Sequence, residues 1–122
     1  MTSAVLIVDG DRDRLARLLP PVKAAGFGVT LADSFEDALA LLKVHGFQAI
    51  VTAHHLGAHN GLHLVLRARS ERPEVMAVVT TPQADPVLDL EASAFGAFSV
   101  VDPWQDAAAL IKLLKASGVR PD

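Results

Sequence analysis

The 122-residue sequence predicts an α/β domain in which a parallel sheet is covered by helices on both faces. Short apolar runs rich in β-branched residues are typical of strands buried on both faces. Segments of helical length separate these runs, and their apolar residues recur at i, i+3, i+4 and i+7. Because the two patterns alternate along the whole chain, we expect repeated strand–helix units.

Five apolar runs predict strands, at residues 5–8, 28–31, 49–51, 75–79 and 98–101. The run at 28–31 is the weakest of them. Five segments carry a helical apolar face, at residues 15–22, 35–42, 62–66, 88–95 and 107–114. The chain is therefore expected to hold five strands and five helices in strict alternation.

Helix boundaries are marked by residues that favour them. Candidate N-caps are Asp11, Ser34, Asn60 and Asp85, the last followed by Pro86. Asp102, followed by Pro103, Trp104 and Gln105, predicts a capped start of the fifth helix. Glycines that should end helices are Gly26, Gly46, Gly96 and Gly118. Pro20 and Pro21 predict a kink or break in the first helix, because each ring removes a backbone donor.

Length and composition indicate one soluble domain over residues 1–122, with a core at about 4–116 and a loose tail at 117–122. The net charge of −3 gives no reason to expect nucleic acid or an anionic membrane as partner. The absence of cysteine excludes a disulfide framework and a thiolate zinc site. The N-terminus shows neither a signal peptide nor a membrane span, so we expect a cytoplasmic location.

The functional crevice of such a sheet lies at the carboxyl ends of its strands. Residues in this place are Asp9-Gly10-Asp11, the loop 53–60, Thr80-Thr81 and Asp102-Pro103. In their order and spacing, these stretches resemble the receiver domain of bacterial response regulators, from about residue 5 to residue 115. The resemblance implies a flavodoxin-like, doubly wound sheet of strand order 2-1-3-4-5 with five helices, and a role in two-component phosphorelay signalling.

Receivers are switches in which an aspartate ending the third strand takes a phosphoryl group from a histidine kinase. The resemblance implies a magnesium ion held by two acids after the first strand, a hydroxyl after the fourth and a lysine after the fifth. Carried over, the first acid falls on Asp9 but the second on Gly10, and the phosphoacceptor falls on Ala53. The hydroxyl falls on Thr81, with Thr80 beside it.

The lysine position falls on Asp102, or on a gap before Pro103, and the aromatic switch position of the fifth strand falls on Val100. Alanine has no nucleophilic atom, and an aspartate in place of the lysine would repel a phosphoryl group. We therefore expect an atypical pseudo-receiver that is not an enzyme and acts through protein–protein contacts without phosphorylation at Ala53.

The expected partner is a protein, either a histidine kinase or a fused or associated output domain, with no nucleic acid and no membrane. A homodimer through the face formed by the fourth helix, fifth strand and fifth helix follows from the resemblance. No cofactor is expected, although Asp9, Asp11 and Asp102 could attract Mg²⁺ weakly. The competing interpretation of Asp11 and Asp102 is that they are helix caps.

The alternative function is a small-ligand or metal sensor that uses the crevice and a run of histidines, His54, His55, His59 and His63. His59 and His63 are four residues apart, a spacing that would place two imidazoles on one helix face. Asp9 or Asp102 would have to supply a further ligand. The plainer interpretation is that these histidines, including the candidates His55, His59 and His63, are polar loop and first-turn residues, and that Trp104 packs beside Pro103.

Overall fold

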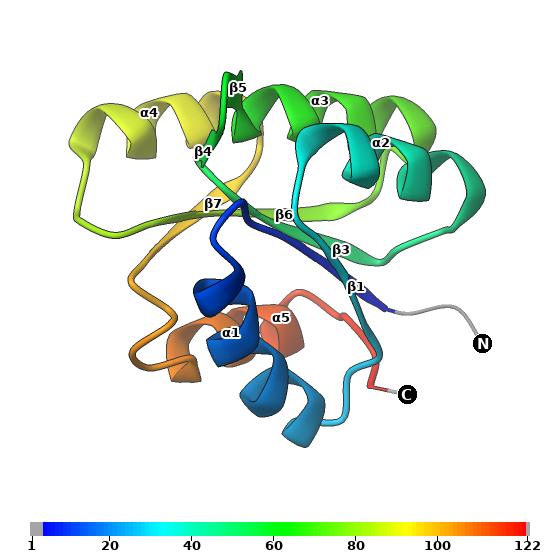
Figure 1. Cartoon of the computed structure of the whole chain (residues 1–122), viewed down its shortest axis with the longest axis vertical. Helices are drawn as coiled ribbons and strands as arrows, with labels where there is room; N and C mark the ends of the chain where they lie inside the picture. The colour runs from blue at the N-terminus through cyan, green and yellow to red at the C-terminus, as the bar shows by residue number, and fades with distance from the viewer. Residues whose placement is uncertain (1–3, 122) are drawn as a thin grey trace.

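The computed structural model describes residues 4–121, which form a parallel five-stranded sheet between two layers of helices (Figure 1). The strand order is β2-β1-β3-β6-β7, and every neighbouring pair is parallel. The strands are β1 (Val5–Val8), β2 (Val29–Ala32), β3 (Ala49–Ala53), β6 (Met76–Thr81) and β7 (Phe98–Val101). The predicted flavodoxin-like order 2-1-3-4-5 is therefore confirmed.

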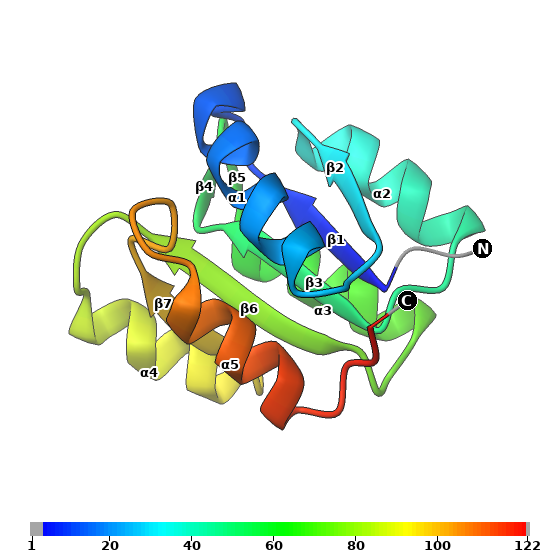
Figure 2. The ribbon, with the colours of Figure 1, turned by 90° about the horizontal axis from the view of Figure 1, so that it is seen from below.

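Two helices cover one face of the sheet and three cover the other (Figures 1 and 2). The first pair is α1 (Arg12–Ala24) and α5 (Ala108–Ala116); the other three are α2 (Phe35–Val44), α3 (Gly61–Glu71) and α4 (Pro86–Ala94). Each layer buries its own apolar cluster against the sheet. None of the helices within residues 4–121 is long and apolar enough to cross a membrane.

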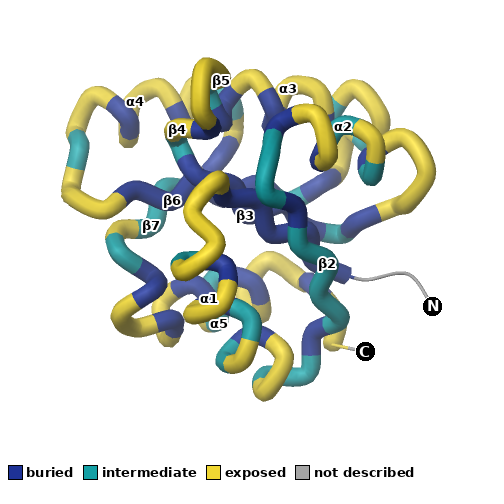
Figure 3. Tube along the Cα trace, viewed as in Figure 1, coloured by how far each residue is buried: buried dark blue, intermediate teal, exposed yellow. Residues whose placement is uncertain are grey.

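Burial follows the position of each strand in the sheet (Figure 3). The central strands β1 and β3 are buried along their whole length, whereas the edge strands β2 and β7 are mostly half-buried or exposed. Both faces of a central strand are covered by helices, which explains why its sequence is a continuous apolar run. The edge strand β2 has a neighbouring strand on one side only and is mostly half-buried, and its sequence signal is correspondingly weak.

Four predicted helix starts are confirmed by side-chain caps. The carboxylates of Asp11 and Asp85 each accept hydrogen bonds from two backbone amides of the first helical turn, and Ser34 and Asn60 each accept one. Each cap satisfies amides that the helix itself leaves unpaired. These contacts are local, so the sequence predicts them without knowledge of the fold.

The predicted cap at Asp102 is wrong. The fifth helix begins six residues later, at Ala108, whose amide donates to Asp106. Asp102 has a left-handed φ of 49°, whereas an N-cap residue needs an extended backbone. Its amide donates to the Thr81 carbonyl at 2.7 Å, and its carbonyl accepts from Gln105. The residue therefore forms a turn between β7 and α5.

Three helix ends match the predicted glycines, since Gly26, Gly96 and Gly118 have φ of 99°, 69° and 82°. Gly46 differs, because α2 ends at an extended His45 and no left-handed residue follows. The predicted break at Pro20 and Pro21 is absent, and α1 runs without interruption to Ala24. Buried Leu18 and Val22 on either side of the prolines hold this stretch against the sheet.

Two further features differ from the prediction. A hairpin of β4 (His55–Leu56) and β5 (His59–Asn60) follows β3, turning at Gly57, which has a φ of 61°. Strands of two residues are too short to produce a periodic pattern. The tail is not loose: Val119 is 5% exposed and the amide of Arg120 donates to Gln48 Oε1 at 3.1 Å. Residues 1–3 and 122 lie outside the described residues.

Candidate functional site

The parallel register brings several of the predicted site residues to one edge of the sheet. Ala53 at the end of β3 pairs with Thr80 on β6, and Thr81 pairs with Val101 on β7. Asp9 directly follows β1, and β1 is the neighbour of β3 on the side opposite to β6. Asp9, Ala53, Thr80 and Thr81 are all buried. The expectation that strand-end residues gather at this edge is therefore confirmed for these four.

Ala53 belongs to the buried apolar cluster, and neighbouring backbone lies close against it. It is 3% exposed, and the next residue, His54, donates its amide to the Thr80 carbonyl at 3.0 Å. Gly61 follows closely, because its amide donates to the His54 carbonyl at 2.7 Å, and a Cβ at Gly61 would overlap the Ala53 carbonyl oxygen. The residue at this position thus ends the strand with a methyl group and offers no nucleophilic atom.

Asp9 is a buried carboxylate with an incomplete set of partners. It is 3% exposed; its Oδ1 accepts the Asp11 amide at 2.9 Å, while its Oδ2 has no hydrogen-bond partner. Burial is the main cause that raises the pKa of Asp9 above its ordinary value. The hydrogen bond from Asp11 and the charge of Arg14 act in the opposite direction. Asp9 is therefore a site at which an added positive charge would be stabilising.

Asp11 serves as a helix cap, as one of the two sequence interpretations proposed. Its Oδ1 accepts hydrogen bonds from the amides of Asp13 and Arg14, at 2.9 and 3.2 Å. Its Oδ2 lies 3.8 Å from Arg14 Nε. Arg14 also lies over the ring of Trp104, with its guanidinium carbon 4.2 Å from the ring centre. Trp104 is 9% exposed, so its predicted packing role is confirmed.

Thr81 and Asp102 are engaged in loop structure. The Thr81 hydroxyl donates to the Gln83 carbonyl at 2.9 Å. Asp102 is half-buried in the turn described above, and Pro103 is buried. Their contacts hold the loops after β6 and β7 in place.

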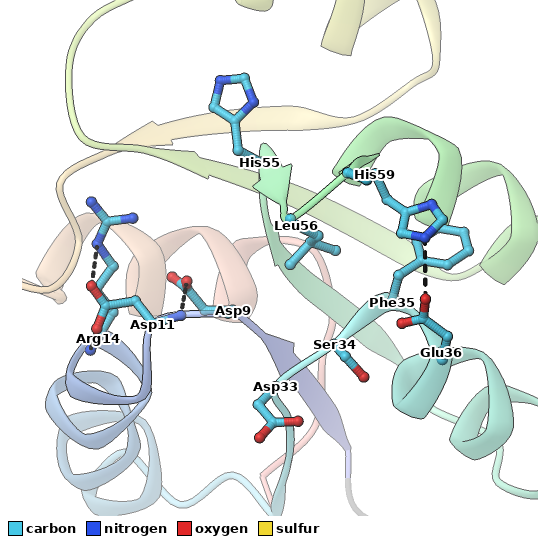
Figure 4. Close-up of a pocket in the computed structure, with 13 residues that line it drawn as sticks. Asp9, Asp11, Arg14, Asp33, Ser34, Phe35, Glu36, His55, Leu56 and His59 are labelled. Carbon is cyan, nitrogen blue, oxygen red and sulfur yellow. Dashed lines mark hydrogen bonds and ion pairs between the residues drawn. The ribbon is translucent and has the colours of Figure 1, made fainter.

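An open hollow of about 710 Å³ lies beside Asp9 (Figure 4). Its walls come from the loop after β1, the start of α2 and the β4–β5 hairpin. Of the predicted site residues, Asp9, Gly10, Asp11, His55 and His59 line it, whereas Ala53, Thr80, Thr81, Asp102 and Pro103 are not among the lining residues. The other residues that line it are Arg14, Asp33, Ser34, Phe35, Glu36, Leu56, Gly57 and Ala58.

Sequence reasoning missed the contribution of residues 33–36 to this hollow. Asp33 directly follows β2, so the rule that selected the other strand ends also applies to it. The apolar pattern of β2 is the weakest of the five, but its carboxyl end still predicts Asp33 as a site residue. Glu36 and Arg14 carry no such signal, because each enters the hollow from the first turn of a helix.

The histidines do not gather into a metal site. His59 belongs to β5, before α3 begins, so the expectation that His59 and His63 share a helix face is wrong. The His59 ring stacks on Phe35 with centroids 4.3 Å apart, and its Nε2 lies 3.2 Å from Glu36 Oε1. His55 lies instead against His54. Across residues 4–121, no group of three or more histidine, aspartate or glutamate side chains is placed to hold a metal ion.

Comparison with known proteins gives the fold. A two-component response regulator from Clostridium difficile superposes with a TM-score of 0.83 at 23% identity, covering 93% of each chain. The chemotaxis protein CheY4 of Vibrio cholerae gives 0.80 at 24% identity, covering 96% of this chain and 99% of that one. The chain has the fold of response-regulator receiver domains.

In sequence, the chain is similar to the acid tolerance regulatory protein ActR of Sinorhizobium medicae (strain WSM419), to which it is 28% identical over 111 residues. The match covers 91% of this chain but 57% of the relative, so the chain spans a little over half of that protein's length. No family model matches the chain. The chain thus shares the topology and packing of receiver domains at low sequence identity. The fold alone does not determine the chemistry at the strand ends, which depends on the residues present there.

Proposed function

We propose that this chain is a receiver-like signalling domain of the two-component type whose state does not depend on phosphorylation at the end of β3. The observation that carries the proposal is the methyl side chain of Ala53 at that position. A phosphoryl transfer to the end of the third strand, as in receivers, requires a carboxylate there, and the methyl group of Ala53 has no atom that can accept the phosphoryl group. The domain acts as a protein-interaction module, not as an enzyme.

Two further residues support this proposal. Gly10 follows Asp9 where a second metal-binding acid would stand, and no lysine stands after β7, where its position falls on Asp102 or on a gap before Pro103. Phosphoryl transfer depends on positioning and charge neutralisation, so the loss of these parts has the same consequence as the loss of the nucleophile. All three changes point to one altered function.

The test is incubation of the purified chain with acetyl phosphate and Mg²⁺, followed by intact mass spectrometry. We expect no adduct on the wild-type chain and none on Ala53→Asp, because Asp102 and Gly10 still withhold the charge partners. The triple variant Gly10→Asp, Ala53→Asp, Asp102→Lys is the positive arm, in which an acyl phosphate should form. A stoichiometric phosphoryl adduct on the wild-type chain would overturn the proposal.

The surface of α4 and β7 supports a protein partner. Large apolar side chains are exposed there: Val87 by 64%, Leu90 by 75%, Phe98 by 48% and Val101 by 47%. The charged side chains within α4 are acidic, Asp89 and Glu91, and those within α5 are basic, Lys112 and Lys115. In a two-fold dimer through α4, β7 and α5, the acidic helix of one copy would face the basic helix of the other.

This dimer is tested by sedimentation of Leu90→Lys. We expect that the wild-type chain self-associates and that the variant sediments as a monomer. Val44→Lys is the matched control, since Val44 is 73% exposed on α2 and lies on a different surface. Equal sedimentation of all three proteins would contradict the dimer and leave a different protein, a histidine kinase or an output domain, as the partner to be sought at this face.

We place the domain in the cytoplasm of a bacterium, with no nucleic acid or membrane contact of its own.

A second candidate function is that of a small-ligand sensor. It is favoured by the hollow beside Asp9, whose buried Oδ2 lacks a partner. The metal-sensing form of this idea has no comparable support, because the histidines point to different neighbours. Titration with zinc or nickel under calorimetry tests that form, and saturable heat with a raised melting temperature would revive it.

A further inference from the structure

The strand β2 forms one edge of the sheet, and β7 forms the other (Figure 2). The carbonyls of Gly28 and Ala32 accept hydrogen bonds from the strand β1 and the residue after it, at 3.0 and 3.1 Å. Because alternate residues of a strand point their backbone groups to opposite sides, Val29 and Leu31 point theirs away from β1. Within residues 4–121, no strand lies on that side. The amides and carbonyls of Val29 and Leu31 are therefore available to a further strand.

The side chains of β2 do not protect this edge. The strand Val29–Ala32 contains neither a charged residue nor a proline, and its register against β1 is regular over all of its residues. Many edge strands carry a lysine, a proline or a bulge that prevents another chain from pairing with them. An edge without these features is suited to the addition of a strand from a binding partner.

An apolar groove of about 470 Å³ lies between α1 and β2. Leu19 of α1 and Leu31 of β2 line it, and both are half-buried, so part of each side chain remains accessible to a ligand. Ala16, also in its lining, is exposed and small, which keeps the groove open. A residue paired with Leu31 would place its side chain on the same face of the sheet. An aliphatic side chain at that position would therefore enter the groove and remove apolar surface from water.

The groove ends at two carboxylates that share one cation. Asp33 directly follows β2, Asp37 belongs to the first turn of α2, and both line the groove. Arg12 Nη2 lies 3.0 Å from Asp33 Oδ2. The pKa of Asp33 is lowered first by its hydrogen bond with Arg12 and then by its contact with Asp37, so the three side chains lie together. One guanidinium group between two carboxylates leaves an excess of negative charge, which favours a basic residue in a ligand that reaches this end.

We propose that the β2 edge binds an extended segment of a partner protein, which adds to the sheet as an antiparallel strand. Backbone hydrogen bonds to Val29 and Leu31 hold the segment, an aliphatic side chain opposite Leu31 fills the groove, and a lysine or arginine lies near Asp33 and Asp37. Antiparallel addition is favoured because its hydrogen bonds are the more stable per residue. The opposite edge, β7, stays available for the dimer proposed above, so this inference goes beyond the proposed function and does not rest on it.

An NMR titration of the ¹⁵N-labelled full chain tests the inference, with the acetylated and amidated peptide Lys-Thr-Val-Thr-Val-Thr as the probe. In the antiparallel register its lysine lies opposite Asp33 and its two valines lie opposite Leu31 and Val29. We expect saturable shifts of the Val29 and Leu31 amides. The same peptide with both valines N-methylated keeps the side chains but loses the backbone donors, and it should bind about tenfold more weakly or worse.

Substitutions in the groove test the side-chain contacts. Leu19→Ala should weaken peptide binding by about threefold or more, whereas Leu41→Ala, a half-buried leucine of α2 outside the groove, should leave it unchanged. Asp37→Asn should cost about threefold, and Glu71→Gln, at the end of α3, should cost nothing. A peptide with glutamate in place of lysine should bind about fivefold more weakly to the wild-type chain. The peptide variants leave the protein unchanged, so the test does not depend on the folding of Leu19→Ala.

Three results would overturn the inference. Equal affinity of the N-methylated and unmodified peptides would show that no strand is added, and the absence of saturable shifts at Val29 and Leu31 would show that the edge does not bind the segment. Shifts of these two amides that grow with protein concentration, without peptide, would identify a second copy of the chain as the occupant. Leu90→Lys should bind the peptide as the wild-type chain does, so failure of the dimer at the β7 edge and failure at the β2 edge can be told apart.

Discussion

Asp9→Asn should stabilise the unliganded protein at neutral pH. The substitution keeps the oxygen that accepts the Asp11 amide at 2.9 Å and removes the charge that burial disfavours. An unsatisfied buried polar group costs about 1–3 kcal/mol, and a charged one more. The asparagine NH₂ is itself left without a partner and recovers only part of this cost, so we expect a net gain of about 1 kcal/mol, or about 4 °C in melting temperature for a domain of this size.

The gain should depend on pH in a defined direction. The folded-state pKa of Asp9 is raised from the ordinary value of 3.8, so the native state holds its proton to higher pH than the unfolded state does. Native-state stability therefore falls as pH rises from 3.8 through the raised folded-state pKa, and it is fully reduced above that pKa. Asparagine does not titrate, so the advantage of the variant should be largest at neutral pH and should shrink towards pH 3.8.

The measurement is urea unfolding of the wild-type chain, Asp9→Asn and Glu71→Gln at pH 4 and pH 8, with EDTA present throughout. Glu71→Gln removes an exposed charge, so its stability difference should stay within about 0.5 kcal/mol at both pH values. If Asp9→Asn is less stable than wild type at pH 8, or if its advantage is the same at both pH values, the charge of Asp9 is not the destabilising group and the reasoning fails.

Two other predictions concern the surroundings of the site. Gly61→Ala should lower the free energy of unfolding in urea by about 3 kcal/mol, because the new Cβ would overlap the carbonyl oxygen that ends β3. Gly57→Ala has open space around its Cβ and should lose only about 1–2 kcal/mol, the cost of a left-handed φ for alanine. Equal losses in the two variants would contradict the close approach at Gly61. Arg14→Ala should shift the emission of Trp104 to the red, since the ring loses its cover; the chain has one tryptophan and no tyrosine, so the signal is unambiguous. Arg17→Ala, on the exposed side of α1, should leave the emission unchanged, and a shift of the same size there would refute the contact.

The elements that sequence reasoning predicted correctly are those set by local contacts. Asp11 and Asp85 cap helices through amides two and three residues ahead, so no knowledge of the fold is needed to find them. Asp102 looked equally local but failed, because the turn after β7 takes a left-handed backbone and delays the helix to Ala108. His59 failed for a related reason: the short hairpin places it before the helix, where it packs on Phe35.

The amino-acid sequence by itself determined that buried strands alternate with amphipathic helices and that the sheet is parallel with right-handed crossovers, whereas its strand order was implied by the resemblance to receiver domains. It also determined that Ala53 cannot carry a phosphoryl group, because that follows from the side chain alone. Only the tertiary structure decided that Asp9 lies buried with one oxygen unpartnered, and that Glu36 shares a hollow with it. Those two facts depend on how the loop at Asp9 and the first turn of α2, 27 residues further along the chain, lie relative to each other, which no local pattern encodes.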